Sequence, residues 1–172
     1  MTVRVVLADD HPMYRFGLRA VLDASSEVEV VGEAADGAEL LALVGRCAPD
    51  VVLTDLSMPR LSGTAAIDEL TRRRPGLGVL VLTMHEDDGS LFGALRAGAR
   101  GYLLKGADRE EIVRAVLAVA GGDAVYGGAV ARRLALSDKT VRNHVSAVLT
   151  KLQVPDRAAA VARAREAGLG EP

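Results

Sequence analysis

The first 122 residues alternate short apolar runs with longer segments in which apolar residues recur at helical spacing. Five runs rich in Val and Leu predict β-strands: Val3–Ala8, Val28–Ala34, Asp50–Thr54, Leu77–Met84 and Gly101–Leu104. Segments with helical spacing or composition follow them: Tyr14–Ala24, Ala38–Arg46, Gly63–Arg74, Ser90–Ala97 and Asp108–Ala120. Because the strands are apolar on both faces, helices must cover both sides of a parallel sheet. Right-handed crossovers then predict a doubly wound, five-stranded α/β fold.

The pattern changes after residue 122. The stretch from Gly121 to Gly128 contains four Gly in eight residues, which is typical of a hinge or linker. Beyond it, helical spacing predicts three short helices: Val130–Leu134, Asp138–Leu152 and Arg157–Ala167. We therefore expect an α/β domain over residues 1–122, a Gly-rich linker over 123–128 and a small all-α segment over 129–172.

Composition places the chain among ordinary globular proteins. Of its 172 residues, 49% are hydrophobic and 26% are charged, which excludes a disordered chain or a disulfide scaffold. The single Cys47 has no partner for an internal disulfide, which indicates a reducing compartment. The apolar runs are far shorter than the roughly 20 residues that a membrane helix needs. We expect a cytoplasmic protein without a membrane segment.

The net charge of −2 hides an asymmetry along the chain. Residues 1–123 carry 13 Lys or Arg against 19 Asp or Glu, whereas residues 124–172 carry 8 against 4. A basic tail on an acidic body indicates an anionic partner, with nucleic acid the first candidate. A solvated helical surface is an equally open interpretation of the same charges.

Polar residues follow four of the predicted strands at the edge where ligands bind in open α/β sheets: Asp9, Asp10, Asp55, Thr83 and Lys105. Three converging carboxylates repel one another unless a cation neutralises them, and all-oxygen ligation fits Mg²⁺. An amine and a hydroxyl on the other side would hold phosphate oxygens. Each residue alone has an ordinary explanation, such as a helix cap for Asp10 or a surface charge for Lys105. Their joint placement favours a phosphate site.

Four segments carry a resemblance to a known family: "VVLADDHPMYRFGL", "VVLTDLSMPRLSG", "VLVLTMHEDD" and "GARGYLLKGA". They resemble the receiver domain of two-component response regulators of the NarL/FixJ subfamily, over residues 3–121. The resemblance implies a flavodoxin-like strand order, 2-1-3-4-5, and phosphoryl transfer from a sensor histidine kinase to Asp55. It also implies that Asp10, Asp55 and the backbone carbonyl of Ser57 ligate Mg²⁺, while Asp9 acts largely through water.

The same resemblance implies a switch next to the acceptor. Thr83 and Lys105 would contact the phosphoryl oxygens, and Tyr102 would take the space vacated when Thr83 moves inward. A plain core position is the alternative for Tyr102. For His11 and His85 we expect no ligand role, because neither has a partner at ligand spacing. His11 is expected at a helix start and His85 in a loop.

The tail "AVARRLALSDKTVRNHVSAVLTKLQVPDRAAAVARAREAGL" resembles the end of a LuxR/FixJ-type helix-turn-helix domain. In that family a recognition helix, here Asp138–Leu152, enters the major groove of promoter DNA, and the last helix makes dimer contacts, which implies a homodimer. Residues of that helix suited to phosphates and base edges are Lys139, Thr140, Arg142, Asn143 and Ser146. The family's first helix, of the type L-T-x-R-E-x-E-V-L, is absent, so the resemblance covers an incomplete domain. A shortened protein, a swapped or oligomeric arrangement that supplies the missing surface, and a sequence closed up over an absent segment are all open explanations.

Three functions are compatible with the sequence. The first is a transcription regulator controlled by phosphorylation, and the second is a receiver that signals or dimerises without binding DNA. The third is a Mg²⁺-dependent hydrolase with an aspartyl intermediate. Haloacid-dehalogenase-type enzymes need an Asp two residues after the nucleophile, and this chain has Ser57 there. The hydrolase therefore ranks last, and we expect the chain not to be an enzyme.

Overall fold

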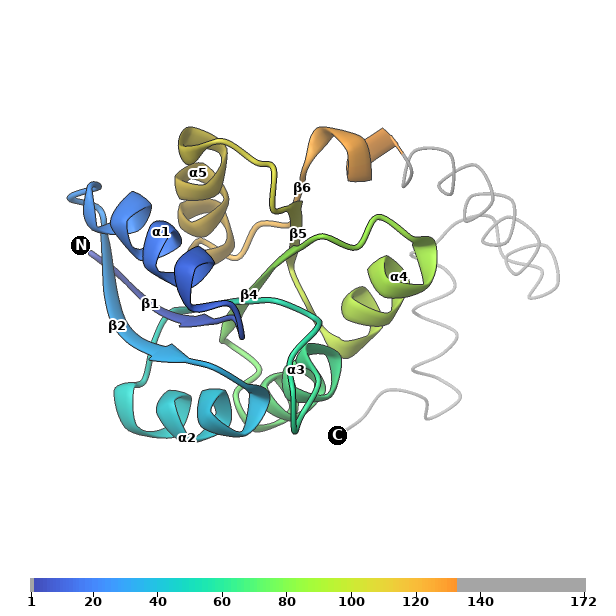
Figure 1. Ribbon diagram of the computed structural model, residues 1–172, viewed down its shortest axis with the longest axis horizontal. Helices are drawn as coiled ribbons and strands as arrows, with labels where there is room; N and C mark the ends of the chain where they lie inside the picture. The colour runs from blue at the N-terminus through green and yellow to red at the C-terminus, as the bar shows by residue number, and fades with distance from the viewer. Residues whose placement is uncertain (1, 133–172) are drawn as a thin grey trace, which may run out of the picture. The chain divides into compact units, whose positions relative to one another are not determined.

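A computed structural model describes residues 2–132 as a parallel sheet covered by helices (Figure 1). Its strands are β1 (Val3–Ala8), β2 (Val28–Ala34), β3 (Val51–Thr54), β4 (Gly78–Thr83), β5 (Gly101–Leu104) and β6 (Val125–Tyr126). Its helices are α1 (Pro12–Asp23), α2 (Gly37–Cys47), α3 (Gly63–Arg73), α4 (Asp88–Ala97) and α5 (Arg109–Ala120). The strands lie in the order β2-β1-β3-β4-β5-β6, and every pairing is parallel.

This architecture confirms the predicted α/β fold and the order 2-1-3-4-5. The sheet has one more strand than predicted, because Val125–Tyr126 lies within the segment interpreted as a linker. There, the amide of Val125 donates to Arg100 O and that of Gly127 to Tyr102 O, at 2.9 and 3.0 Å. A strand of two residues in a Gly-rich segment has no apolar alternation, so the hydrophobic pattern could not reveal it.

The core forms two layers, one on each face of the sheet. Helices α1 and α5 lie on one face, and α2, α3 and α4 lie on the other (Figure 1). Alternate strand residues such as Val5 and Leu7 pack with Leu18 and Leu22 of α1 and with the apolar side of α5. Strand residues are buried on both faces, which is why the strands read as nearly continuous apolar runs.

Helix boundaries place the loops that carry the polar residues. Pro12 occupies the first turn of α1, and Gly98 ends α4 with φ 108°. Helices α2 to α5 begin with side chains that accept hydrogen bonds from first-turn amides: Asp36, Ser62, Asp87 and Asp108. These caps fix where each loop leaves the sheet.

Contacts divide the chain into two units, Met1–Val130 and Ala131–Pro172. A helical turn covers residues 128–132, where the first helix of the tail was predicted to begin. The predicted recognition helix Asp138–Leu152, its five candidate DNA-contacting residues and the helix Arg157–Ala167 lie outside the described residues. Within residues 2–132, no helix is long and apolar enough to span a membrane.

Candidate functional site

The acidic residues predicted at the strand ends lie close together. Asp9 and Asp10 follow β1, and Asp55 follows the neighbouring strand β3. Ligand atoms of these three carboxylates and of the His11 ring all lie within 4.8 Å of one another. Asp9 and Asp55 are buried, whereas Asp10 is partly exposed and His11 is exposed. The site is therefore a carboxylate pocket with one open side.

Lys105 closes the pocket from the end of β5. Its Nζ lies 2.6 Å from Asp9 Oδ2 and 2.8 Å from Asp55 Oδ2, and its side chain is 6% exposed. Burial alone would lower the pKa of Lys105, but the hydrogen bonds and negative charges of Asp55 and Asp9 outweigh it and raise the pKa above its ordinary value. A protonated amine thus faces both buried carboxylates.

The backbone around Asp55 fixes the direction of its side chain. Asp55 Oδ1 accepts from the amide of Leu56 at 2.6 Å and from that of Ser57 at 3.4 Å. Helix α3 starts directly behind this loop, where the amide of Gly63 donates to Leu56 O at 2.9 Å. A Cβ at position 63 would lie 2.0 Å from Asp55 O, so only glycine permits this approach.

Asp9 and Asp10 differ in how far their oxygens are already engaged. Asp9 Oδ1 accepts from the amide of His11 at 2.8 Å, and Asp9 Oδ2 contacts Lys105. Asp10 Oδ1 is buried, and it is the one such side-chain atom among residues 2–132 without a hydrogen-bond partner. His11 Nδ1 lies 2.9 Å from it, but not in hydrogen-bonding geometry. A buried carboxylate oxygen that accepts no hydrogen bond, beside two further carboxylates, fits a divalent cation with oxygen ligands.

The two predicted switch residues meet at the loop after β4. Thr83 is fully buried, and its Oγ1 accepts from the amide of His85 at 3.3 Å. Tyr102 is also fully buried, and its hydroxyl donates to His85 O at 2.9 Å. The imidazole Nε2 of His85 lies 2.5 Å from Ser57 Oγ. His85 thus connects the loop after β3 with both switch residues.

Several residues of the site were not predicted from sequence. Tyr14 places its ring 4.5 Å from the Nζ of Lys105. Burial raises the pKa of the Tyr14 hydroxyl to about 12, against the opposing charge of Lys105 and with the support of Asp9 and Asp55. Arg15 donates to Asp9 O at 2.5 Å.

The two histidines have the positions that we expected along the chain. His11 is the residue before α1 and His85 lies in the loop after β4. The sequence did not predict their contacts at the site, because these contacts depend on the loop conformation, which the hydrophobic periodicity does not determine. The Pro12 that follows His11 was the one sequence signal that α1 starts beside the acidic residues.

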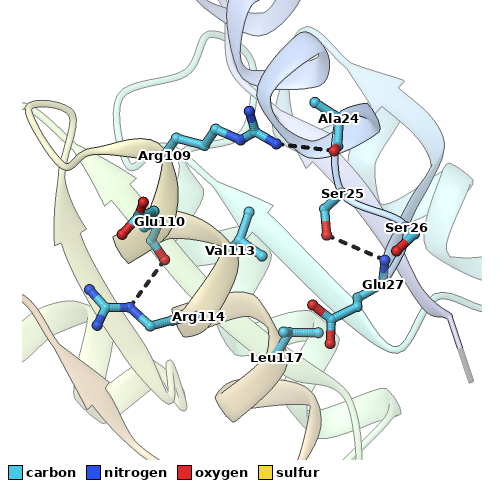
Figure 2. A pocket seen from close by; sticks show the side chains of 9 residues that line it. All are labelled: Ala24, Ser25, Ser26, Glu27, Arg109, Glu110, Val113, Arg114 and Leu117. Atoms are coloured by element: carbon cyan, nitrogen blue, oxygen red, sulfur yellow. Dashed lines mark hydrogen bonds between the residues drawn. The ribbon is translucent and has the colours of Figure 1, made fainter.

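A separate open cavity of about 650 Å³ lies between the loop after α1 and helix α5 (Figure 2). None of the predicted site residues lines it. Arg109 donates to Ala24 O at 3.0 Å and Arg114 to Glu110 O at 3.2 Å, so both guanidinium groups bind the backbone (Figure 2). The acidic Glu27 and Glu110 also line this cavity.

Comparison with known protein families shows which family the chain belongs to. Residues 5–117 match the response regulator receiver domain, and residues 128–164 match the luxR family of bacterial regulatory proteins. The chain belongs to the response regulator family. It is a response regulator with a LuxR-type DNA-binding domain, and this places it among transcription regulators rather than hydrolases. A receiver implies a kinase as partner, and the LuxR-type domain implies DNA.

Relatives of this response regulator cover its chain to different extents. The uncharacterized transcriptional regulatory protein YxjL of Bacillus subtilis is 39% identical over 77% of this chain and 61% of its own length. The "Probable transcriptional regulatory protein NarL" of Mycobacterium tuberculosis is 35% identical over 94% of this chain and 93% of its own length. That alignment spans 201 positions, more than the 172 residues of this chain, so this response regulator has gaps opposite its relative.

Solved structures show the same fold. The receiver domain of NarL from Mycobacterium tuberculosis has a TM-score of 0.68 and 42% identity, covering 70% of this chain and 98% of that one. A LuxR-family response regulator from Aurantimonas sp. has a TM-score of 0.76 and 33% identity, with 80% and 99% covered.

Proposed function

We propose that this response regulator is controlled by transfer of a phosphoryl group from a sensor histidine kinase to Asp55. The observation that carries the proposal is the position of Asp55, buried between the carboxylates after β1 and the ammonium of Lys105 at 2.8 Å. In the transfer, an Asp55 oxygen attacks phosphorus, the P–N bond of the phosphohistidine breaks, and the leaving imidazole keeps the electron pair and takes up a proton. Hydrolysis of the acyl phosphate by water restores the carboxylate.

Each polar residue has a distinct task in this reaction. Lys105 neutralises negative charge on the phosphoryl oxygens, since its ammonium is already held beside Asp55. The hydroxyl of Thr83, at the end of the adjacent strand β4, donates to another phosphoryl oxygen. Transfer of this kind depends on positioning and charge neutralisation more than on covalent chemistry from the protein.

The residues present fit Mg²⁺. Asp10, Asp55 and the backbone carbonyl of Ser57 would ligate it, and the Oδ1 of Asp10, which accepts no hydrogen bond, supports a direct contact. Asp9, whose Oδ2 contacts Lys105, would act largely through water. When bound, the ion supplies charge neutralisation for the carboxylates and the incoming phosphoryl group.

Exposed apolar side chains near the acidic pocket support a protein as the phosphoryl donor. Met13 is 81% exposed, Phe16 69% and Met84 74%; the first two lie at the start of α1 and the third directly follows Thr83. Large exposed apolar side chains grouped around a site are typical of a docking surface. A donor that delivers a phosphoryl group to Asp55 must cover this region.

The switch proposed here joins the acceptor to the output part of the chain. Because the Tyr102 ring is already buried, phosphorylation would first change Thr83, whose hydroxyl would turn from the His85 amide toward the phosphoryl group. Strand β5, which carries Tyr102, is paired through Gly127 with the segment that leads to the tail. A change at β5 thus reaches residues 125–130 directly.

The proposed domains are a receiver over 1–122, a connecting segment over 123–128 and a shortened LuxR-type domain over 129–172. Within the last, Arg142 and Asn143 are the proposed base-reading residues, with Lys139, Thr140 and Ser146 as further DNA contacts. The longer alignments exceed the 172 residues of this chain, so the relatives carry residues that it lacks, and the absent first helix of the tail is one place for them. We propose a homodimer on promoter DNA in the cytoplasm, where the DNA lies.

One experiment tests the acceptor. The full chain is incubated with Mg²⁺ and acetyl phosphate, and intact mass is measured before and after treatment with hydroxylamine, which cleaves acyl phosphates. We expect one added phosphoryl group that hydroxylamine removes, and none in Asp55→Asn. Asp68→Asn, an exposed carboxylate on α3, is the matched control. Equal labelling of the Asp55→Asn protein would refute the assignment.

A second experiment tests the output. DNA fragments are selected with the phosphorylated and unphosphorylated chain at low salt, where phosphate contacts are strongest. Retention that is lost in Arg142→Ala supports a DNA-binding regulator. No retention in either state, together with phosphorylation-dependent dimers in size-exclusion chromatography, would favour a receiver whose output is association alone.

A further inference from the structure

The ammonium of Lys105 has three neighbours, two of which are anions. Asp9 and Asp55 each accept from it through Oδ2, at 2.6 and 2.8 Å. The third neighbour is the ring of Tyr14, whose centroid lies 4.5 Å from Nζ. This distance is within the range in which an aromatic face attracts a cation. The site therefore holds its one amine between two carboxylates and an aromatic ring.

The start of α1 places the Tyr14 ring next to the Lys105 ammonium. Pro12 sets the first turn of the helix directly after the acidic residues, and Tyr14 follows in that turn. Tyr14 is half-buried and packs against the core cluster that includes Leu18 and Ile112. Beside it, an open hollow of about 290 Å³ is lined by Tyr14 and Lys105 among others. The ring and the amine thus both border this hollow.

A ring offers Lys105 something that a third carboxylate or a water molecule would not. An ammonium has three N–H donors, and two of them are used by Asp9 and Asp55. An aromatic face attracts the charge without requiring one fixed hydrogen-bond direction. The ammonium can therefore turn one donor from Asp55 toward an arriving phosphoryl oxygen while the ring still attracts it.

We propose that Tyr14 is a positioning residue for phosphoryl transfer, which holds the ammonium of Lys105 over its ring face beside Asp55. The proposal rests on the proposed function, because Lys105 matters only if phosphoryl oxygens arrive there. It is the ring, not the hydroxyl, that does this task. A purely structural Tyr14 would instead act on the fold and independently of Lys105.

The first test compares Tyr14→Phe, which keeps the ring, with Tyr14→Leu, which keeps apolar volume only. Phosphorylation rates of the full chain are measured by intact mass with Mg²⁺ and acetyl phosphate. We expect the Phe protein to stay within twofold of the wild type and the Leu protein to be slower by roughly fivefold, the size of a partly desolvated cation–π contact. Phe92→Leu, on α4, is the matched control. Equal slowing of the Phe and Leu proteins would overturn the proposal, as would an unchanged rate for Leu.

A double-mutant cycle separates positioning from structure. In a Lys105→Met background, Tyr14→Leu should change the remaining rate by less than twofold, because the group it acts through is gone. A similar fivefold loss in both backgrounds would show a structural role and refute the proposal. If thermal unfolding shows that the Leu protein is not folded, Tyr14→Met, a flexible apolar residue, replaces it in the cycle.

A spectroscopic measurement tests the contact without any reaction. The ring of Tyr14 should shift the NMR signals of the Lys105 side chain, and this shift should persist in Tyr14→Phe and vanish in Tyr14→Leu. If the wild-type chain shows the shift but takes up no phosphoryl group, the proposed function fails while the contact stands. If the rate responds as expected but the shift is absent, the positioning proposal fails by itself.

Discussion

Lys105 Nζ donates to Asp55 Oδ2 at 2.8 Å across fifty residues of sequence. The same ammonium contacts Asp9. Lys105 therefore neutralises the carboxylates to which Mg²⁺ would bind, and the two cations compete for them. We expect Lys105→Met to bind Mg²⁺ more tightly, on the order of tenfold, because a positive charge leaves the site. Phosphorylation by acetyl phosphate should nevertheless slow by roughly 100-fold, the usual effect of removing a donor to a developing anion.

Calorimetric titration with Mg²⁺ and mass-based rates measure these two effects on the same protein. Arg96→Met, which removes an exposed positive charge from α4, is the control and should alter neither. Weaker Mg²⁺ binding in Lys105→Met would contradict the competition between amine and cation.

We expect Asp10 to lower the stability of the fold without Mg²⁺, which its proposed role as a Mg²⁺ ligand explains. Its buried Oδ1 accepts no hydrogen bond and lies among other carboxylates, with the exposed His11 ring 2.9 Å away. Without Mg²⁺, Asp10→Ala should raise the free energy of unfolding by about 1 kcal/mol, since an unsatisfied charged group is removed. Mg²⁺-dependent phosphorylation should fall by roughly 100-fold or more. Urea unfolding and labelling rates test this, with Asp68→Ala as the exposed control; a destabilised Asp10→Ala protein would refute the argument.

Sequence alone placed the chemistry of the site but not its contacts. Asp9, Asp55 and Lys105 could be predicted together because the carboxyl ends of parallel strands share one edge of the sheet. Loop geometry decided the rest. The contact of Ser57 with His85 joins two loops that no periodicity relates, and the ring of Tyr14 reaches Lys105 only through the entry angle of α1.

Gly63 is required by the close approach of α3 to the acceptor strand. A Cβ there would lie 2.0 Å from the backbone oxygen of Asp55. Neither the Cβ nor a backbone oxygen can move without shifting the main chain. We expect Gly63→Ala to lower the free energy of unfolding by roughly 3 kcal/mol and to disturb Asp55. Gly45→Ala is the matched control, since its Cβ meets nothing within 4 Å inside α2. The free energy of unfolding of Gly45→Ala should rise by up to about 1 kcal/mol. Equal stabilities of the two alanine variants would contradict the structure at Gly63.

Phe16 should matter for a protein donor and not for a small one. Its side chain is exposed on α1, on the surface that a kinase would cover. We expect Phe16→Ser to slow transfer from any histidine kinase that phosphorylates the wild-type chain, by roughly tenfold, as for an apolar interface residue. Labelling by acetyl phosphate should stay unchanged. Ala20→Ser, exposed on the same helix, is the control. Slowing with both donors would indicate damage to the site instead of lost docking.

The Tyr14 hydroxyl should make the free energy of unfolding fall at high pH. Its pKa is raised from 10.0 to about 12 in the folded chain, so the neutral hydroxyl stabilises the fold fully below pH 10. That contribution is lost as the pH rises from 10 through 12, because the unfolded chain releases the proton first. For a half-exposed ring the loss should be roughly 1 kcal/mol once solvent screening is allowed for. Urea unfolding of wild type and Tyr14→Phe across this range should give a steeper decline for the wild type. Tyr126→Phe should decline like the wild type, and parallel curves for all three proteins would show that the Tyr14 hydroxyl is not buried as described.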